Sequence, residues 1–194
     1  MNVWRERLGR WFSPIAQRCP LSPNAITVIA LLLNVAAAYL LYRRFFLIAM
    51  VVLIVGGVAD AFDGIVARVQ NKSSRFGDFL DHVCDRISDT LLITGWLLGN
   101  GVWLPLTIAS IIAVMLNGYV GTQIEATWGT RSYDSMGRGE FVLALVVYPI
   151  VSHILFANGW AAMHIQDWMT GLLLLVALLG IAQRFALAIR SERS

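Results

Sequence analysis

Charged residues are scarce in this chain. Only 14% of its 194 residues are charged, while 58% are hydrophobic, and the mean hydropathy is +0.68. An ordinary soluble domain is about 45–50% apolar and about 25% charged, so the composition argues against a soluble domain. It also excludes a disordered chain, which carries too few apolar side chains to form a core.

Cysteine and histidine are also scarce, with two cysteines and three histidines in the whole chain. Cys19 and Cys84 are too few and too badly spaced for a disulfide framework or a zinc site. Cys84 stands next to Asp85 and invites the role of a nucleophile, but a small hydrophobe in a helix is the better interpretation. The histidines do not form a set of metal ligands.

Basic stripes are absent as well. The net charge is +3, but the arginines lie between apolar runs, without the aromatic interleaving of a nucleic-acid-binding surface. We therefore expect no nucleic-acid partner and interpret the arginines as signals of membrane topology.

What the chain does have is long apolar runs. A membrane helix needs about 20 mostly apolar residues, and six runs of about this length are bounded by Arg, Pro, Gly or polar clusters. They cover residues 25–42, 45–69, 77–98, 103–128, 138–156 and 168–188. The sequence therefore predicts an all-α integral membrane protein with six transmembrane helices (25–188), and we see no boundary that divides residues 1–194 into two domains.

The segment before the first span, residues 1–18, has apolar and aromatic side chains at helical spacing, with arginines on the other face. This pattern predicts an amphipathic helix in the membrane interface. A signal peptide is disfavoured, because the apolar run begins only at residue 25 and no small-residue cleavage site follows it.

Arginine and lysine predict the orientation, since cytoplasmic loops carry the excess of these residues. Twelve of the 15 lie before the first span, after the second and fourth spans, or at the end of the chain. Arg43 and Arg44 are on the other side, and Arg86 is inside a span. Both termini are therefore expected in the cytoplasm, in a multi-pass protein of the cell membrane.

The acidic residues are concentrated where they are least expected. Six of the 12 lie in or beside two apolar spans: Asp60, Asp63, Asp78, Asp81, Asp85 and Asp89. An aspartate near the centre of a membrane helix costs about 2.5–3.5 kcal/mol on insertion scales, so unneutralised acids here would be strongly unfavourable. Something must neutralise them.

Helix geometry predicts that four of these acids meet. At about 1.5 Å per residue, Asp60 and Asp63 lie about 22 and 27 Å from Phe45. Asp85 and Asp81 lie about 20 and 26 Å from Leu98 on the returning helix. If the two helices are antiparallel neighbours, the acids lie at matching depths near the cytoplasmic edge, and spacings of three and four place each pair on one face.

Such an all-carboxylate cluster suits hard divalent cations, Mg²⁺ or Mn²⁺, and has enough oxygens for two ions. Paired metals of this kind are a recurrent device for phosphoryl transfer. Salt bridges with Arg68 and Arg86 are an alternative, but they neutralise only two of the charges. Gly57, Gly64 and Gly77 share faces with the acids, where small residues allow either close helix packing or close approach of a ligand.

Residues 60–85 resemble the signature of the CDP-alcohol phosphotransferase family, D-x2-D-G-x2-A-R-x8-G-x3-D-x3-D. All eight defining positions are present, and they are Asp60, Asp63, Gly64, Ala67, Arg68, Gly77, Asp81 and Asp85. The resemblance covers 26 residues, and the six predicted spans agree with the architecture of this family.

The resemblance implies a homodimeric membrane enzyme that transfers a substituted phosphate from a CDP-alcohol to a second alcohol and releases CMP. Asp60, Asp63 and Asp81 would bind the metals. Asp85 would be the general base and could also contact a metal. The CDP group would lie against residues of the motif, namely Asp60, Gly64, Ala67, Arg68, Gly77 and Asp81.

The acceptor is less clear from the sequence. Phosphatidylinositol-phosphate synthases of the family bind the acceptor phosphate through basic residues on later helices, and Arg138 and Arg184 resemble two of these. The family pattern S-Y-x-K/R-A-R-A-E has Gly121 and Gln123 at its two basic positions here. Arg131 is a further source of charge.

We therefore expect CDP-diacylglycerol, or an archaeal CDP-diether lipid, as donor and a polar alcohol such as inositol phosphate or glycerol 3-phosphate as acceptor. Two other classes use acids in membrane helices. Intramembrane prenyltransferases carry two separate Asp-rich motifs, whereas this chain has one compact motif. A divalent-cation transporter needs polar residues through the full membrane depth, but the outer halves of these two helices are nearly all apolar.

Overall fold

The structure, a computed structural model, describes residues 12–129, 138–159 and 165–191. Long helices make up most of these residues, and no strand occurs among them. They are α2 (Pro23–Tyr42), α3 (Phe46–Val69), α4 (Arg75–Asn100), α5 (Leu104–Trp128), α6 (Arg138–Ala157) and α7 (Ile165–Ser191). Each one overlaps a run expected from the sequence, so the prediction of an all-helical chain is confirmed.

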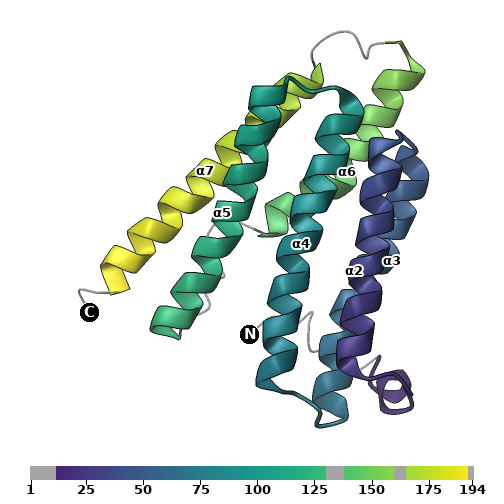
Figure 1. The fold of residues 1–194 in the computed structure, drawn as a ribbon, viewed down its shortest axis with the longest axis vertical. Helices are drawn as coiled ribbons and strands as arrows, with labels where there is room; N and C mark the ends of the chain where they lie inside the picture. The colour runs from purple at the N-terminus through teal and green to yellow at the C-terminus, as the bar shows by residue number, and fades with distance from the viewer. Residues whose placement is uncertain (1–11, 130–137, 160–164, 192–194) are drawn as a thin grey trace.

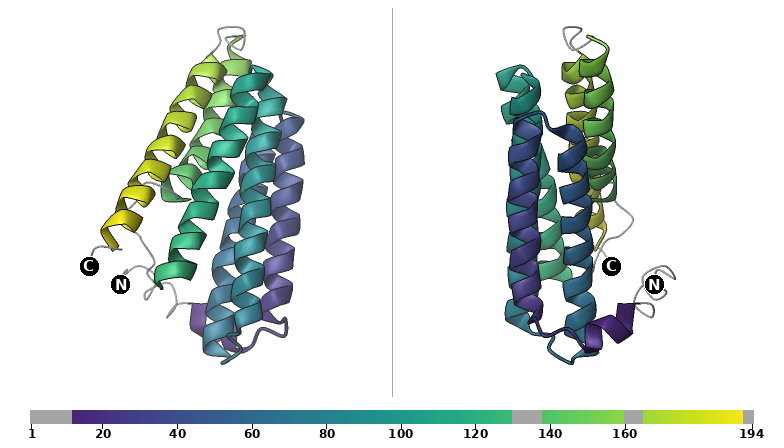
Figure 2. Two further views of the ribbon diagram at one scale, coloured as in Figure 1. Left: turned by 60° about the vertical axis from the view of Figure 1, so that its left-hand side comes forward. Right: turned by 90° about the vertical axis from the view of Figure 1, so that its right-hand side faces the viewer.

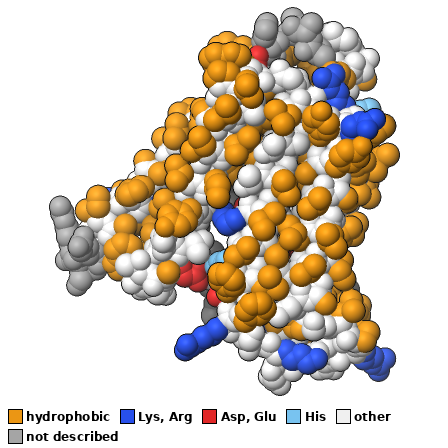
Figure 3. Space-filling view, viewed as in Figure 1, with side chains coloured by type: hydrophobic (Ala, Val, Ile, Leu, Met, Phe, Trp, Pro, Cys, Tyr) orange, Lys and Arg blue, Asp and Glu red, His pale blue; other side chains and the backbone are white. Residues whose placement is uncertain are grey.

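Four of these helices are long and apolar enough to cross a membrane. They are α2, α3, α5 and the Ile165–Arg190 part of α7. Helix α4 contains several acidic residues, and the apolar part of α6 is the shorter stretch Leu143–Ala157. Apolar side chains cover most of the face in Figure 3, and basic side chains lie mainly toward its two ends. This distribution fits a multi-pass membrane protein.

The helices run roughly along one long axis (Figures 1 and 2). Helix α2 packs against both α3 and α4, α5 packs against α7, and α4 also contacts α5. Helices α3 and α4, which are joined by a short loop, are therefore both held by α2. The beginning of the described chain and the end of α7 lie toward the same end of the bundle.

Local sequence signals account for the helix ends nearest this loop. Ser22 caps α2, with its side chain accepting a hydrogen bond from the Ala25 backbone N–H, and Pro23 occupies the first turn, where its missing N–H has no consequence. Ser74 caps α4 in the same way through the N–H of Gly77. These caps fix where α2 and α4 begin, and thereby the register of the side chains that follow.

Glycines on α4 allow α2 to approach closely. A Cβ atom on Gly95 would collide with the carbonyl oxygen of Ala38, and one on Gly99 would lie 2.5 Å from the carbonyl oxygen of Leu41. Small residues at such contacts bring helix backbones together, and the van der Waals contact stabilises helix pairs in membranes.

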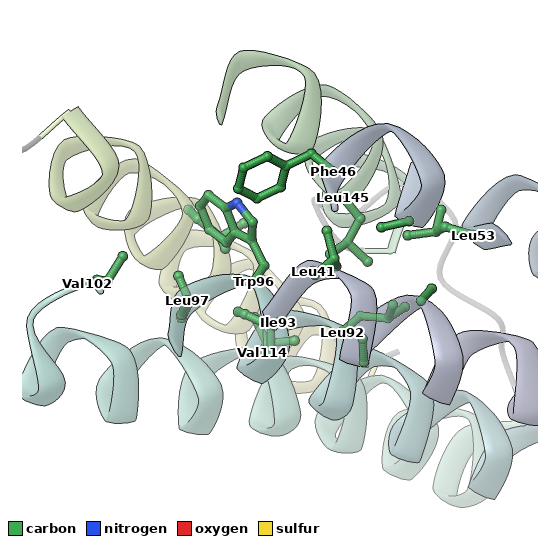
Figure 4. Packing of buried hydrophobic residues seen from close by; sticks show 14 of the residues in the cluster. Leu41, Phe46, Leu53, Leu92, Ile93, Trp96, Leu97, Val102, Val114 and Leu145 are labelled. Atoms are coloured by element: carbon green, nitrogen blue, oxygen red, sulfur yellow. The ribbon is translucent and has the colours of Figure 1, made fainter. Parts of the chain in front are cut away.

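The buried apolar residues form two clusters. The larger one joins the upper parts of the helices in Figure 1, and Trp96, Leu41 and Phe46 belong to it (Figure 4). The smaller one contains Ala16, Ile26, Ile65 and Val66. Asp60 and Asp63 of the sequence motif lie in the same part of α3 as Ile65 and Val66, toward the end of the helix that leads to α4.

The segment before α2 is seen only in part. Residues 12–17 are helical, whereas residues 1–11 lie outside the described part of the chain. Phe12 packs edge-on against Phe62, with ring centroids 6.2 Å apart. The side-chain amide of Gln70 donates hydrogen bonds to the carbonyl oxygens of Ala16 and Cys19. These contacts attach the segment to the end of α3, and the predicted interfacial helix stays a prediction.

Arg44, one of the two arginines on the unexpected side, has a structural role. It lies in the turn between α2 and α3 with a positive φ of 63°. Its guanidinium donates a hydrogen bond to the carbonyl oxygen of Gly99 at the end of α4 and lies 4.8 Å from the ring centroid of Phe156. A cation at a helix C-terminus is favourable, so this arginine serves packing rather than topology.

Candidate functional site

Three carboxylates come together between α3 and α4. Asp60 and Asp63 extend from α3 and Asp81 from α4, and one oxygen of each lies within 4.8 Å of the other two. Asp63 is buried, and the other two are half-buried. We call these residues the acidic triad. The antiparallel placement of α3 and α4 thus brings together acids that are separated by 18 or more positions in the sequence.

Asp85 lies one helical turn beyond Asp81 on α4 and is buried. It shares a helix face with Asp81, as its spacing of four residues requires, but it is not part of the triad. The expected cluster of four acids is therefore seen as three that converge and one that follows deeper along α4.

Helix α2 contributes a hydroxyl group to the triad. The Thr27 hydroxyl lies 2.5 Å from a carboxylate oxygen of Asp63, and both residues are buried. No signal in the sequence points to this contact, because the two residues are 36 positions apart and belong to different helices.

The glycines near the triad differ from those that hold α2 to α4. A Cβ atom on Gly64 would make only ordinary contact with the Arg68 guanidinium, at 3.5 Å, and one on Gly57 would meet no described atom within 4 Å. On Gly77 it would lie 3.2 Å from side-chain oxygens of Asn24 and Ser74. Helix packing among the described residues therefore does not explain Gly57 or Gly64.

The remaining residues of the motif lie around the loop end of α3. Ala67 is half-buried, whereas Arg68 is exposed in the last turn of the helix. Gly64 is on the same end of α3, with the Arg68 guanidinium 3.5 Å from where its Cβ would be, and Gly77 is in the first turn of α4. The loop ends of α3 and α4 thus carry small residues and one exposed cation.

Two arginines lie against glycines of α5. The Arg86 guanidinium fills the space where a side chain at Gly118 would be, and the Arg184 guanidinium does the same at Gly121. Arg184 comes from α7 and donates a hydrogen bond to the backbone carbonyl of Asn117. Gly121 is the position where the family pattern has a basic residue, so a cation reaches that place from another helix.

The other expected acceptor residues are only partly visible. Arg138 is the first residue of α6, and its side chain lies outside the described part of the structure. Arg131 belongs to residues 130–137, which also lie outside it. Their roles stay predictions.

One of the two salt bridges considered as an alternative to a metal is present. Arg86 pairs with Asp89, with 3.2 Å between a guanidinium nitrogen and a carboxylate oxygen. The spacing of three residues could have revealed this pair from the sequence. A second polar contact, from the Asn34 amide to the Ser88 hydroxyl at 3.1 Å, joins α2 to α4 beside it. The sequence suggested a salt bridge of Arg86 but not its partner, and it did not indicate the contact between Asn34 and Ser88.

The donor set fits a divalent cation. Three carboxylates this close repel one another, and a bound cation removes the repulsion. Carboxylate oxygens are preferred by hard ions such as Mg²⁺ and Mn²⁺. The triad also lies near one end of the bundle, where α3 ends and α4 begins. A charged phosphate group could therefore reach it without crossing the apolar cluster that surrounds Trp96.

A comparison with protein families matches residues 20–182 to the CDP-alcohol phosphatidyltransferase model. Among curated relatives, the archaetidylinositol phosphate synthase of Pyrococcus horikoshii is 30% identical over 166 residues, which covers 85% of each chain. The phosphatidylinositol phosphate synthase of Mycobacterium tuberculosis is 28% identical over 175 residues and covers 85% of this chain and 81% of its own.

Solved structures agree in fold. The crystal structure of the Mycobacterium tuberculosis phosphatidylinositol phosphate synthase with CDP-DAG bound has a TM-score of 0.74 to this chain, at 23% identity, and covers 92% of it and 94% of its own chain. The same enzyme with manganese and citrate gives a TM-score of 0.71. The family match spans most of the sequence and includes the helices that carry the acidic triad, and the chain belongs to the CDP-alcohol phosphatidyltransferase family.

Proposed function

We propose that this protein is a phospholipid synthase that transfers a phosphatidyl or archaetidyl group from a CDP-lipid to a polar alcohol and releases CMP. The observation that carries the proposal is the acidic triad, three carboxylate oxygens within 4.8 Å of one another inside the region that matches the family. The relatives named above make inositol phosphate lipids, which supports a phosphorylated polyol such as inositol phosphate or glycerol 3-phosphate as acceptor.

In this proposal, Asp60, Asp63 and Asp81 hold the divalent metal, with two Mg²⁺ or Mn²⁺ ions as the preferred arrangement. The structure of a fold relative with manganese supports a divalent cation. When bound, the metal would supply positive charge that stabilises the diphosphate of the CDP-lipid and the CMP leaving group. The role of the chain is to hold these carboxylates in place from two rigid helices.

Asp85 is proposed as the general base. The acceptor hydroxyl loses its proton to this carboxylate as its oxygen attacks the β-phosphorus, and the bond between that phosphorus and the CMP oxygen breaks. Asp85 lies one turn deeper than Asp81 on the same face of α4, so an acceptor beside the triad is within its reach. A positioned base of this kind contributes about 10²–10⁴-fold to rate.

The CDP group is proposed to lie on the loop side of the triad, against Gly64, Ala67, Arg68 and Gly77. The absence of a side chain at Gly64 leaves the α3 backbone accessible, and Arg68 is exposed and able to turn toward a phosphate. A guanidinium suits this role because its planar set of N–H donors matches phosphate oxygens.

The acceptor phosphate is proposed to bind Arg184, with Arg138 and Arg131 as further basic groups. Arg184 lies over Gly121, and this placement supports the proposal because it supplies positive charge where the family pattern has a basic residue. The missing basic side chain on α5 is thus compensated from α7.

We propose the remaining features on the basis of the family and the helix pattern. All six helices cross the cell membrane, residues 1–18 form an interfacial helix, residues 1–194 make one domain, and the active chain is a homodimer. The termini and the site face the cytoplasm, and the site also opens toward the lipid. Twelve of the 15 basic residues lie on the side proposed as cytoplasmic.

A donor and acceptor assay tests the function. The purified protein is incubated with radiolabelled CDP-diacylglycerol or its diether analogue, Mg²⁺, and one of inositol phosphate, glycerol 3-phosphate, serine or inositol, and CMP release is measured. We expect CMP release only with a phosphorylated acceptor. We also expect the Arg184→Met variant to have a raised KM for that acceptor. Absence of CMP with every pair, or no effect of Arg184→Met, would contradict the corresponding proposal.

The glycines near the triad and the glycines of α4 that contact α2 give a separate prediction. Gly64→Ala should fold with nearly unchanged thermal stability, because its Cβ makes only ordinary contact, but the KM for the CDP-lipid should rise as the new methyl group meets the ligand. Gly95→Ala should instead lower stability by about 1–3 kcal/mol, the usual cost of overpacking. Thermal unfolding in detergent measures the stability of the two variants, and initial rates measure their KM for the CDP-lipid. A Gly64→Ala enzyme with normal KM would contradict the proposed position of the CDP group.

A further inference from the structure

Helix α2 lies beside the acidic triad but has no charged residue in its sequence, PNAITVIALLLNVAAAYLLY. It packs on both helices that carry the acids. It contacts the triad through the Thr27 hydroxyl, which approaches the Asp63 carboxylate to 2.5 Å.

The geometry at Thr27 favours the carboxylate as hydrogen-bond partner. The hydroxyl has one proton, and two acceptors are near it: the Pro23 carbonyl at 3.1 Å and the Asp63 carboxylate at 2.5 Å. A threonine in a helix commonly donates to the carbonyl four residues earlier. Here the carboxylate is much closer, and hydrogen bonds to ionised acceptors are the shorter and stronger ones.

Thr27 is held firmly in this position. It lies in the second turn of α2, just after the Ser22 cap and Pro23, and its side chain is buried. The close contact of α2 with Gly95 and Gly99 of α4 fixes the helix further along. A donor on such a rigid support restricts rotation of the carboxylate that accepts its proton. Carboxylates that bind metals are commonly held by hydrogen bonds of this kind.

We propose that Thr27 is a positioning residue, whose hydroxyl holds the Asp63 carboxylate in the orientation in which it binds the divalent metal. Helix α2 thereby takes part in the site without providing a metal ligand. The inference rests on the proposed metal-binding role of the triad, and it assigns to this chain a determinant of metal affinity outside the sequence motif.

Mn²⁺ binding to the full-length protein in detergent tests the inference, measured by electron paramagnetic resonance titration without substrate. Thr27→Val keeps the shape of the side chain and removes the hydroxyl, whereas Thr27→Ser keeps the hydroxyl. Loss of a supporting hydrogen bond typically costs about 10–100-fold in metal affinity, so we expect about a tenfold or greater loss in Thr27→Val. Thr27→Ser should bind Mn²⁺ nearly as tightly as the unchanged protein, because it keeps the hydroxyl donor.

Thr107→Val is the matched control. Thr107 is equally buried on α5, and its hydroxyl bonds only to the backbone carbonyl of Val102 among the described residues. This variant should bind Mn²⁺ normally even if its stability falls. The Mn²⁺ concentration for half-maximal CMP release should rise in Thr27→Val, while the rate at saturating Mn²⁺ recovers.

The outcomes separate the two proposals. If the unchanged protein binds no Mn²⁺, the metal-binding role of the triad is wrong. If it binds Mn²⁺ and Thr27→Val binds equally well, the triad stands and the positioning role of Thr27 is wrong, whatever the change in stability. Should Thr27→Val not fold, Thr27→Ala provides the same comparison with Thr27→Ser, and equal affinity of the two overturns the inference.

Discussion

Replacing Asp81 by asparagine is expected to abolish Mn²⁺ binding and to lower the rate of CMP release by about a thousandfold or more, since a bound metal supplies several kcal/mol of charge stabilisation. The change removes one charge from α4 and leaves the size of the side chain nearly unchanged. Within the acidic triad, Asp81 is the only member from α4. Its loss therefore removes the connection between the two helices that a shared metal would make.

Asp78→Asn is the control for this variant. Asp78 is three positions from Asp81 on the same helix, but its side chain is largely exposed and lies 3.8 Å from His82. The same change of charge at this position should leave Mn²⁺ binding and activity close to normal, because exposed ion pairs contribute little. Unchanged Mn²⁺ affinity in Asp81→Asn would contradict the assignment of the triad as the metal site.

Replacing Asp85 by asparagine is expected to lower kcat by about 10²–10⁴-fold, the usual contribution of a general base. Mn²⁺ binding should be largely retained, because the triad forms without Asp85. This combination distinguishes a base from a metal ligand, which the sequence alone left open. Isothermal titration with Mn²⁺ and CMP release at saturating metal and substrates measure the two effects.

Two results would change the assignment of Asp85. Loss of Mn²⁺ binding as severe as in Asp81→Asn would make Asp85 a metal ligand rather than a base alone. Nearly normal kcat with normal Mn²⁺ binding would exclude it from both roles. Asp78→Asn again controls for the removal of a negative charge from α4.

Much of the fold follows from the sequence because it depends on local signals. Apolar runs of membrane length place the helices within a few residues of their observed bounds. The convergence of acids on two antiparallel helices also follows from the rise per residue and the short loop. The spacing of three and four residues, however, does not reveal which acids come closest.

The arginines show where local reasoning is insufficient. In the count of basic residues on each side of the membrane, Arg44 is an exception to the predicted orientation. In the structure its guanidinium caps the carbonyl end of α4. Gly121 is a departure from the family pattern in the sequence, but in the structure Arg184 occupies its space. In both cases the partner lies on another helix and more than 50 positions away.

The sequence by itself determined that this is a helical membrane protein, which family it resembles, and which acids are available to bind a metal. These properties depend on composition, periodicity and spacing within a helix or between neighbours joined by a short loop. The tertiary structure alone decided that Asp60, Asp63 and Asp81 form the triad, that Thr27 contacts Asp63, and that the Arg184 guanidinium occupies the space beside Gly121 of α5. Such contacts depend on how the helices rotate and cross, which packing across the whole bundle sets and no local pattern encodes.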